Sequence, residues 1–175
     1  MRLHALLLAP LLALPFSGMA RAESAAPAAK AEAGKSSPQW VPLDEAVKKA
    51  AGSSKYVFVE VYTDWCGYCR KLNATTLRAQ PVLNELNKNF QSVRLNAESP
   101  QTVTWKGKKV SERQMATNWG VTGFPTMLFL NGKGEIIGSY SAYADTKLMV
   151  SLLTYISSGA REKNVSFDAF LEGKG

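Results

Sequence analysis

Hydrophobic and polar positions alternate along the chain in blocks that fit short helices and strands in turn. Residues 43–51, LDEAVKKAA, carry apolar side chains at helical spacing, with acids in the first turn and Gly52 as a stop. Residues 56–62, YVFVEVY, are mostly β-branched or aromatic, which predicts a strand buried on both faces. A helix follows that begins at or just after Cys66 and continues through residues 70–79, because apolar residues recur on one side at helical spacing.

The later blocks continue the alternation and end in a hairpin and a helix. Their turn and capping residues, chiefly Gly, Pro, Asn and Ser, mark the boundaries. The pattern predicts a helix over 81–89 with Pro81 in its first turn, a strand over 90–95, a hairpin over 102–110 around Lys106-Gly107, a helix over 112–119 with Ser111 and Gln114 as a capping box, a strand over 126–130, a turn at 131–134, a strand over 135–140 and a helix over 145–157.

This order of elements predicts an α/β fold. Early parallel units followed by an antiparallel hairpin imply a mixed central sheet flanked by helices on both sides. The hairpin near 102–110 is then a small insertion. Three tryptophans, Trp40, Trp105 and Trp119, are assigned to packing.

The first 22 residues have the three-part layout of a secretory signal. Arg2 precedes the apolar run 3–16, and small residues then lead to a cleavage site after Ala22, or second after Ala20. An uncleaved membrane anchor is the alternative, but the apolar run is shorter than the ~20 residues that span a bilayer. We therefore expect a periplasmic or secreted protein.

Three further segments complete the predicted organisation. Residues 23–39, ESAAPAAKAEAGKSSPQ, contain no large apolar side chain and are predicted as a flexible linker. Residues 40–158 form the folded domain. Residues 159–175 form a C-terminal tail in which SFDAFLEG adds one short turn.

Charge indicates no nucleic-acid partner. The 175 residues carry 21 basic and 14 acidic side chains, and removal of residues 1–22 takes away two arginines and no acid, which leaves a net charge of +5. The lysines are scattered rather than gathered with aromatic residues on one face, as nucleic-acid binding requires. A solvated surface explains them.

The chemistry centres on the only two cysteines, Cys66 and Cys69, which could clasp a metal, staple a loop or exchange disulfides. The one histidine, His4, lies in the expected signal, so the mature chain lacks imidazole for a zinc or copper site, and we expect no metal or cofactor. A staple that closes two residues constrains the unfolded chain very little. A redox pair remains favoured, with Cys66 as a low-pKa thiolate at a helix N-terminus and Cys69 resolving the mixed disulfide.

The sequence resembles the thioredoxin family over residues 40–158. The resemblance rests on Trp65-Cys66-Gly67-Tyr68-Cys69-Arg70-Lys71, the strand before it, and Gly120-Val121-Thr122-Gly123-Phe124-Pro125-Thr126. It implies a thioredoxin fold in which Pro125 is a cis-proline beside the cysteines and the backbone at Phe124 pairs with an extended substrate. It also implies that Trp65, Gly67 and Tyr68 line the substrate groove. A trans proline that starts a strand is the alternative for Pro125.

Two charged residues complete the predicted site. Glu60 interrupts the buried strand, where an ionised carboxylate is costly unless it is paired. The resemblance implies that Glu60, with a raised pKa, takes a proton from Cys69, and that Arg94 opposes it and limits the rise. The alternatives are an outward-facing acid at a sheet edge and a strand acid that is merely satisfied.

Different parts of the motif resemble family members that transfer electrons in different directions. The TDWC segment resembles secreted thioredoxin-like reductants, whereas Gly67-Tyr68 resembles periplasmic disulfide isomerases. Asn73 departs from the acid found there in transmembrane reductase domains. We expect a monomeric periplasmic oxidoreductase that reduces disulfides of exported proteins, with a membrane thiol reductase as electron donor. The alternatives are an isomerase or oxidase of the same fold, or a non-enzymatic chaperone or metal-delivery module.

Overall fold

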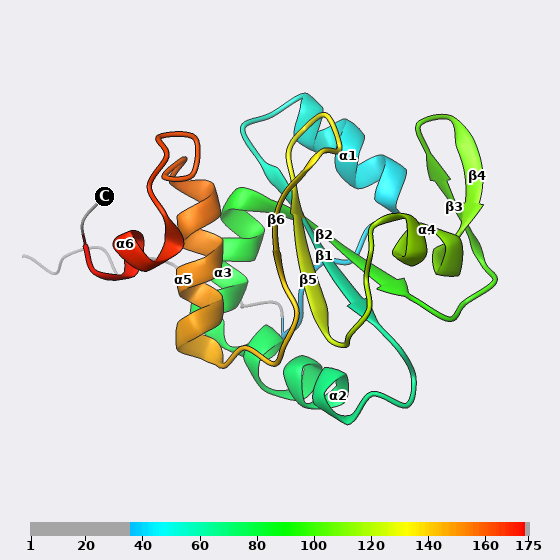
Figure 1. The fold of residues 1–175 in the computed structure, drawn as a ribbon, viewed down its shortest axis with the longest axis horizontal. Coiled ribbons are helices and arrows are strands. Elements are labelled where there is room, and N and C mark those ends of the chain that lie inside the picture. Colours follow the sequence, from blue (N-terminus) through cyan, green and yellow to red (C-terminus); the bar gives the residue numbers. More distant parts are fainter. Residues whose placement is uncertain (1–35, 174–175) are drawn as a thin grey trace, which may run out of the picture. The chain divides into compact units, whose positions relative to one another are not determined.

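The computed structural model describes residues 36–173 and is built on a four-stranded mixed sheet (Figure 1). The expected signal 1–22, with His4, and most of the predicted linker lie outside the described residues. The strands run in the order β2-β1-β5-β6, with β2 parallel to β1 and the other two pairs antiparallel. Their bounds are β1 Tyr56–Tyr62, β2 Phe90–Asn96, β5 Thr126–Leu130 and β6 Ile136–Tyr140.

Helices cover both faces of this sheet, as the sequence predicts. Phe58 and Phe129 face a hydrophobic cluster that includes residues of α2, α3 and α5, whereas Val59 and Leu128 face a second cluster with α1 and α4. The helices are α1 Leu43–Ala51, α2 Gly67–Ala74, α3 Gln80–Asn89, α4 Glu112–Asn118, α5 Thr146–Ser157 and α6 Phe167–Leu171.

The strand that precedes the cysteines forms the centre of the sheet. β1 lies between β2 and β5, and its five inner residues are buried. The prediction of a strand buried on both faces is therefore confirmed. The cysteine segment follows directly after the carboxyl end of this central strand.

The helix predicted to continue through residues 70–79 is interrupted, and this part of the prediction is wrong. α2 ends at Ala74, Thr75 leaves the helical conformation, and a short 3-10 turn, η1 Thr76–Arg78, follows. The Thr75 hydroxyl donates to the Lys71 carbonyl at 2.8 Å, while the Thr76 hydroxyl donates to the Ala144 carbonyl at 2.9 Å. The first bond is local, whereas the second joins η1 to the loop before α5, and this tertiary bond overrides the helical periodicity.

The predicted insertion forms a separate two-stranded sheet, β3 Thr102–Trp105 and β4 Lys108–Ser111. Trp105 packs edge-on against Trp119, with ring centroids 5.6 Å apart. Its ring also lies over Gly134, where an added Cβ would come within 2.7 Å of the ring. Trp40 packs against the hydrophobic cluster that contains Phe58 and Phe129. All three tryptophans assigned to packing therefore do pack.

The tail is part of the folded unit. Tyr155 of α5 contacts the rings of Phe167 and Phe170 of α6 at 5.3 and 5.4 Å, and its hydroxyl donates to the Val165 carbonyl at 2.8 Å. Aromatic packing thus fixes the short turn predicted there. Within residues 36–173, none of the helices has the length and apolar character to span a membrane.

Candidate active site

The two cysteines form a disulfide at the beginning of α2. Cys66 is the N-cap residue of this helix, and its Sγ accepts a hydrogen bond from the Cys69 backbone N–H at 3.0 Å. The Cα atoms are 5.3 Å apart across the disulfide. The predicted helix start is confirmed, and it places the sulfur of Cys66 among the unpaired N–H groups and the positive end of the helix dipole.

Neither half-cystine is well exposed in this oxidised form. Cys66 is 4% exposed and Cys69 1% exposed in the disulfide. The exposed surface around it comes instead from Trp65 and Tyr68, which are 64% and 63% exposed.

The Phe124-Pro125 segment lies beside the end of β1. Thr126 pairs with Val61 in the antiparallel β1·β5 register, and the peptide bond between Phe124 and Pro125 is cis. The Phe124 ring meets the exposed Trp65 ring edge-on, with centroids 5.9 Å apart. The fold thus brings together two motifs that are about sixty residues apart in the sequence.

A second aromatic contact involves Tyr68, which lies between the two cysteines in the sequence. The Tyr68 ring is 6.1 Å from the Tyr143 ring, and Lys71 places its ammonium group 4.6 Å from the Tyr143 centroid. Side-chain hydrogen bonds with Thr75 and Thr76 lower the pKa of Tyr143. Sequence reasoning missed Tyr143, because it lies in the loop before α5 and belongs to no motif.

Glu60 is fully buried in the middle of β1. It lies opposite Arg94 in the β1·β2 register, and Arg94 Nε donates to Glu60 Oε2 at 2.9 Å. The guanidinium group lies 3.8 Å from the Tyr62 ring centroid. The alternative that placed Glu60 outward at a sheet edge is wrong, and the predicted opposition to Arg94 is confirmed.

Asn73 connects this carboxylate to the cysteine helix. Its Nδ2 donates to Glu60 Oε1 and, at 3.0 Å, to the carbonyl oxygen of Cys69. Burial raises the pKa of Glu60, while the charge of Arg94 and the hydrogen bonds from Arg94 and Asn73 oppose that rise. Sequence reasoning noted Asn73 only as a departure, although its position four residues after Cys69 puts both on one face of a helix.

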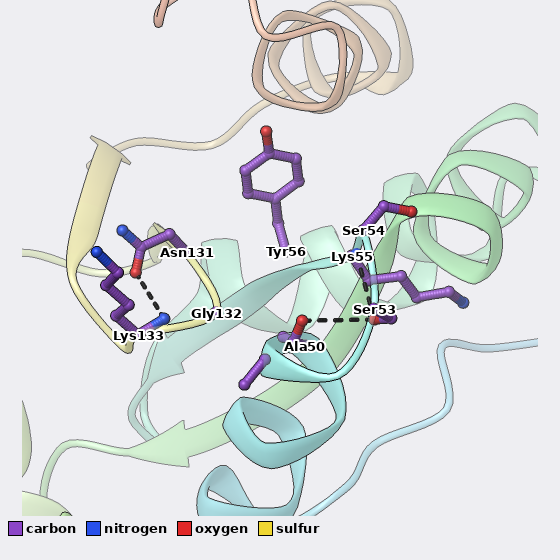
Figure 2. Close-up of a pocket in the computed structure, with 9 residues that line it drawn as sticks. Ala50, Ser53, Ser54, Lys55, Tyr56, Asn131, Gly132 and Lys133 are labelled. Carbon is purple, nitrogen blue, oxygen red and sulfur yellow. Dashed lines mark hydrogen bonds between the residues drawn. The ribbon is translucent and has the colours of Figure 1, made fainter.

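A metal site is not formed by the acidic, cysteine and histidine side chains of residues 36–173, among which no group of three comes together. A hollow of about 380 Å³ does exist at the other end of the sheet, where Tyr56 begins β1 (Figure 2). Figure 2 shows Lys133 and Asn131 on one side of it and Ser53 and Lys55 on the other. Tyr56 lines the hollow, and the other six residues of β1 lie between it and the cysteine segment, so the two are distinct.

A disulfide at a helix N-terminus, a central strand with a buried acid and an adjacent cis-proline define the class of thioredoxin-fold proteins with a dithiol–disulfide centre. Residues 43–157 match the family described as the thioredoxin-like domain. The chain belongs to this thioredoxin-like family.

Known relatives agree with the fold. The chain is 36% identical over 94 residues to protein disulfide isomerase-like 5-2 of Oryza sativa subsp. japonica, a match that covers 53% of this chain and 19% of that protein. It thus spans about a fifth of the length of that curated relative. A thioredoxin from Thermus thermophilus has a TM-score of 0.58 at 24% identity, covering 72% of this chain and 93% of that one. A thioredoxin-fold protein from Helicobacter pylori has a TM-score of 0.63 at 16% identity, covering 69% and 82%.

Proposed function

We propose that this chain is an exported, periplasmic thioredoxin-like thiol:disulfide oxidoreductase that reduces disulfides in other exported proteins. The observation that carries the proposal is the Cys66–Cys69 disulfide at the N-cap of α2, where Cys66 Sγ accepts the Cys69 N–H. Backbone donors and the helix dipole favour a thiolate on Cys66, the form that attacks disulfides.

The cycle transfers two electrons in two exchange steps. The Cys66 thiolate attacks one sulfur of the substrate disulfide, forms a mixed disulfide and releases the other substrate sulfur as a thiolate. Cys69 then loses its proton to Glu60 and attacks Cys66 Sγ. The substrate leaves as a dithiol after its thiolates gain protons, and the Cys66–Cys69 disulfide shown in the structure is restored.

The substrate binds as an extended segment across the cysteine end of the sheet. Trp65 and Tyr68 offer exposed rings next to the cysteines in the sequence, and Gly67 between the cysteines is exposed and has no side chain to block a peptide. The backbone at Phe124, before Pro125, supplies pairing groups. An exposed apolar surface of this kind suits unfolded or loop segments of other proteins.

Continued reduction needs an electron donor outside the chain, because each cycle leaves Cys66 and Cys69 oxidised. We assign this role to a membrane thiol reductase, which exchanges with the same disulfide. The secretory pattern of residues 1–22 supports the exported location. Mass spectrometry of the protein expressed with all 175 residues tests it, since a start at Glu23 or Arg21 is expected and a retained Met1 contradicts it.

Trapping of the mixed disulfide tests the activity. The Cys69→Ser protein retains the attacking thiol but cannot resolve the intermediate, so it should accumulate covalent adducts with a peptide disulfide. The Cys66→Ser protein should accumulate none. A Cys69→Ser protein that binds no substrate sulfur would overturn the proposal.

A disulfide isomerase is the second candidate, because the curated relative from Oryza sativa carries that name. The reduction potential separates the two functions. A value near ~−270 mV supports a reductant, and one between ~−180 and ~−120 mV supports an isomerase or oxidase. Equilibration of the purified protein with glutathione buffers supplies the value.

The proton transfer has its own test. Replacing the buried acid with Glu60→Gln removes the acceptor while it keeps the side-chain shape, and we expect release from the mixed disulfide to slow by about 100-fold at neutral pH. Release at the wild-type rate would show that Cys69 loses its proton to another group.

A further inference from the structure

Asn73 is the side chain that physically joins the buried carboxylate to the resolving cysteine. It lies on α2 one helical turn after Cys69, so both face the same side of the helix. One amide nitrogen donates to Glu60 Oε1 and to the Cys69 carbonyl. Asn73 is the second-last residue of α2, and these two bonds hold its side chain in place.

We infer that Asn73 is a positioning residue, which holds the Glu60 carboxylate against the first turn of α2 so that Cys69 loses its proton during the second exchange step. This inference rests on the proposed function, since it concerns the release of a substrate from Cys66. Asn73 itself neither gains nor loses a proton in the step.

Three elements contribute side chains around Glu60, and among them Asn73 is the one that comes from the cysteine helix. β2 contributes Arg94, which occupies Oε2 from the strand side, and β5 contributes the apolar Met127. The helix side contributes Asn73, which occupies Oε1. At the end of β1, the Tyr62 ring packs against the Arg94 guanidinium group.

Further charged groups lie near Tyr62 and Arg94. Burial raises the pKa of Tyr62, the charge of Arg94 lowers it, and the charges of Asp64, Glu112 and Glu60 raise it further. The side-chain hydrogen bond between α2 and the carboxylate comes from the Asn73 amide, and removal of that amide breaks it together with the bond to the Cys69 carbonyl.

Two substitutions separate positioning from simple structural support. Asn73→Ala removes the donor that opposes the raised pKa of Glu60, so the pH at which release accelerates should rise, and release at neutral pH should slow about tenfold. Asn73→Asp keeps the size but places a second carboxylate beside Glu60, and it should move the acceleration further in the same direction.

The chain offers a matched control. Asn89 donates to Glu85 Oε2 at 2.8 Å within α3, again across one helical turn, but far from the cysteines in sequence. Asn89→Asp should leave the pH profile of release as in the wild-type protein. Release is followed as single-turnover loss of the mixed disulfide between full-length protein and a peptide disulfide, across pH 5 to 9, about the range in which buried acids titrate.

A double substitution decides whether Asn73 acts through Glu60. In the Glu60→Gln background, Asn73→Ala should have no further effect on the pH profile. An unchanged profile for Asn73→Asp, or an equal shift with and without Glu60, would overturn the inference even if Asn73→Ala fails to fold. Failure of the proposed function would appear differently, as the absence of any adduct on the Cys69→Ser protein.

Discussion

Arg94 and Glu60 face each other on adjacent parallel strands and form an ion pair of 2.9 Å with very unequal burial. The carboxylate is fully buried, whereas 34% of the arginine side chain is exposed. Solvent therefore supports the cation while the acid depends on its partners. Loss of the partner should therefore cost more free energy for Glu60 than for Arg94.

Removal of the cation should destabilise the fold. Arg94→Met keeps an apolar side chain but removes the guanidinium group over Tyr62 and leaves Glu60 without its positive partner, and we expect a loss of about 2 kcal/mol in the free energy of unfolding at pH 7. This is less than the ~3–5 kcal/mol of fully buried pairs because Arg94 is partly exposed. Urea denaturation measures it. Lys48→Met, which breaks the exposed Lys48–Asp44 pair, is the control and should change stability by less than ~0.5 kcal/mol.

The pH dependence of stability should report the buried acid. Burial raises the pKa of Glu60 above its ordinary value of 4.5, so the folded state holds this proton more tightly than the unfolded state. The associated stability is present below pH 4.5 and is lost as pH rises through the folded pKa. Glu60→Gln should therefore gain stability relative to wild type as pH increases. A constant difference between the two proteins from pH 4 to 8 would contradict this.

Gly134 should be intolerant of any side chain. It has φ of +73°, and an added Cβ would meet the Trp105 ring at 2.7 Å. We expect Gly134→Ala to cost about 3 kcal/mol in unfolding free energy, from backbone strain plus overpacking. Gly120→Ala is the matched control, since φ is +68° with open space around it, and it should cost only about 1 kcal/mol. Equal losses would show that the Trp105 contact contributes nothing.

The exposed ring beside the thiols should contribute to substrate binding. Trp65→Ala should lower kcat/KM for a peptide disulfide by about tenfold, as loss of an aromatic contact residue does, with almost no change in stability. Ile136→Ala on β6 provides the comparison, because Ile136 is also an exposed apolar residue but pairs with Leu130 at the other end of the sheet. If the two substitutions have the same effect on kcat/KM, Trp65 has no special role.

Sequence reasoning succeeded where local pattern and tertiary structure agree. The apolar run of β1 and the Cys-x-x-Cys segment gave the central strand and the helix that starts at Cys66, and the Trp65 and Phe124 motifs proved to be neighbours. These features follow from burial on two faces and from helix capping, which short stretches of sequence encode.

It failed where partners from distant parts of the chain decide the outcome. The break after Ala74 depends on the bond from Thr76 to the Ala144 carbonyl, which no local periodicity contains. The role of Asn73 likewise depends on Glu60, thirteen residues earlier on a different element. Side-chain bonds of this kind become visible only when the sheet register and helix position are known.

The sheet's two edges differ in how they meet the surroundings. Along β2, Trp40 forms a bridge to Ser92, and the Val41 N–H donates to the Ser92 carbonyl at 2.9 Å, so part of that edge is already paired. β6 is only five residues long, and its register with β5 shifts between Phe129 and Leu130. A short, irregular strand is a poor template for another chain. The described fold thus limits strand addition and ordered aggregation, while its exposed aromatic surface at the cysteines stays available to partners.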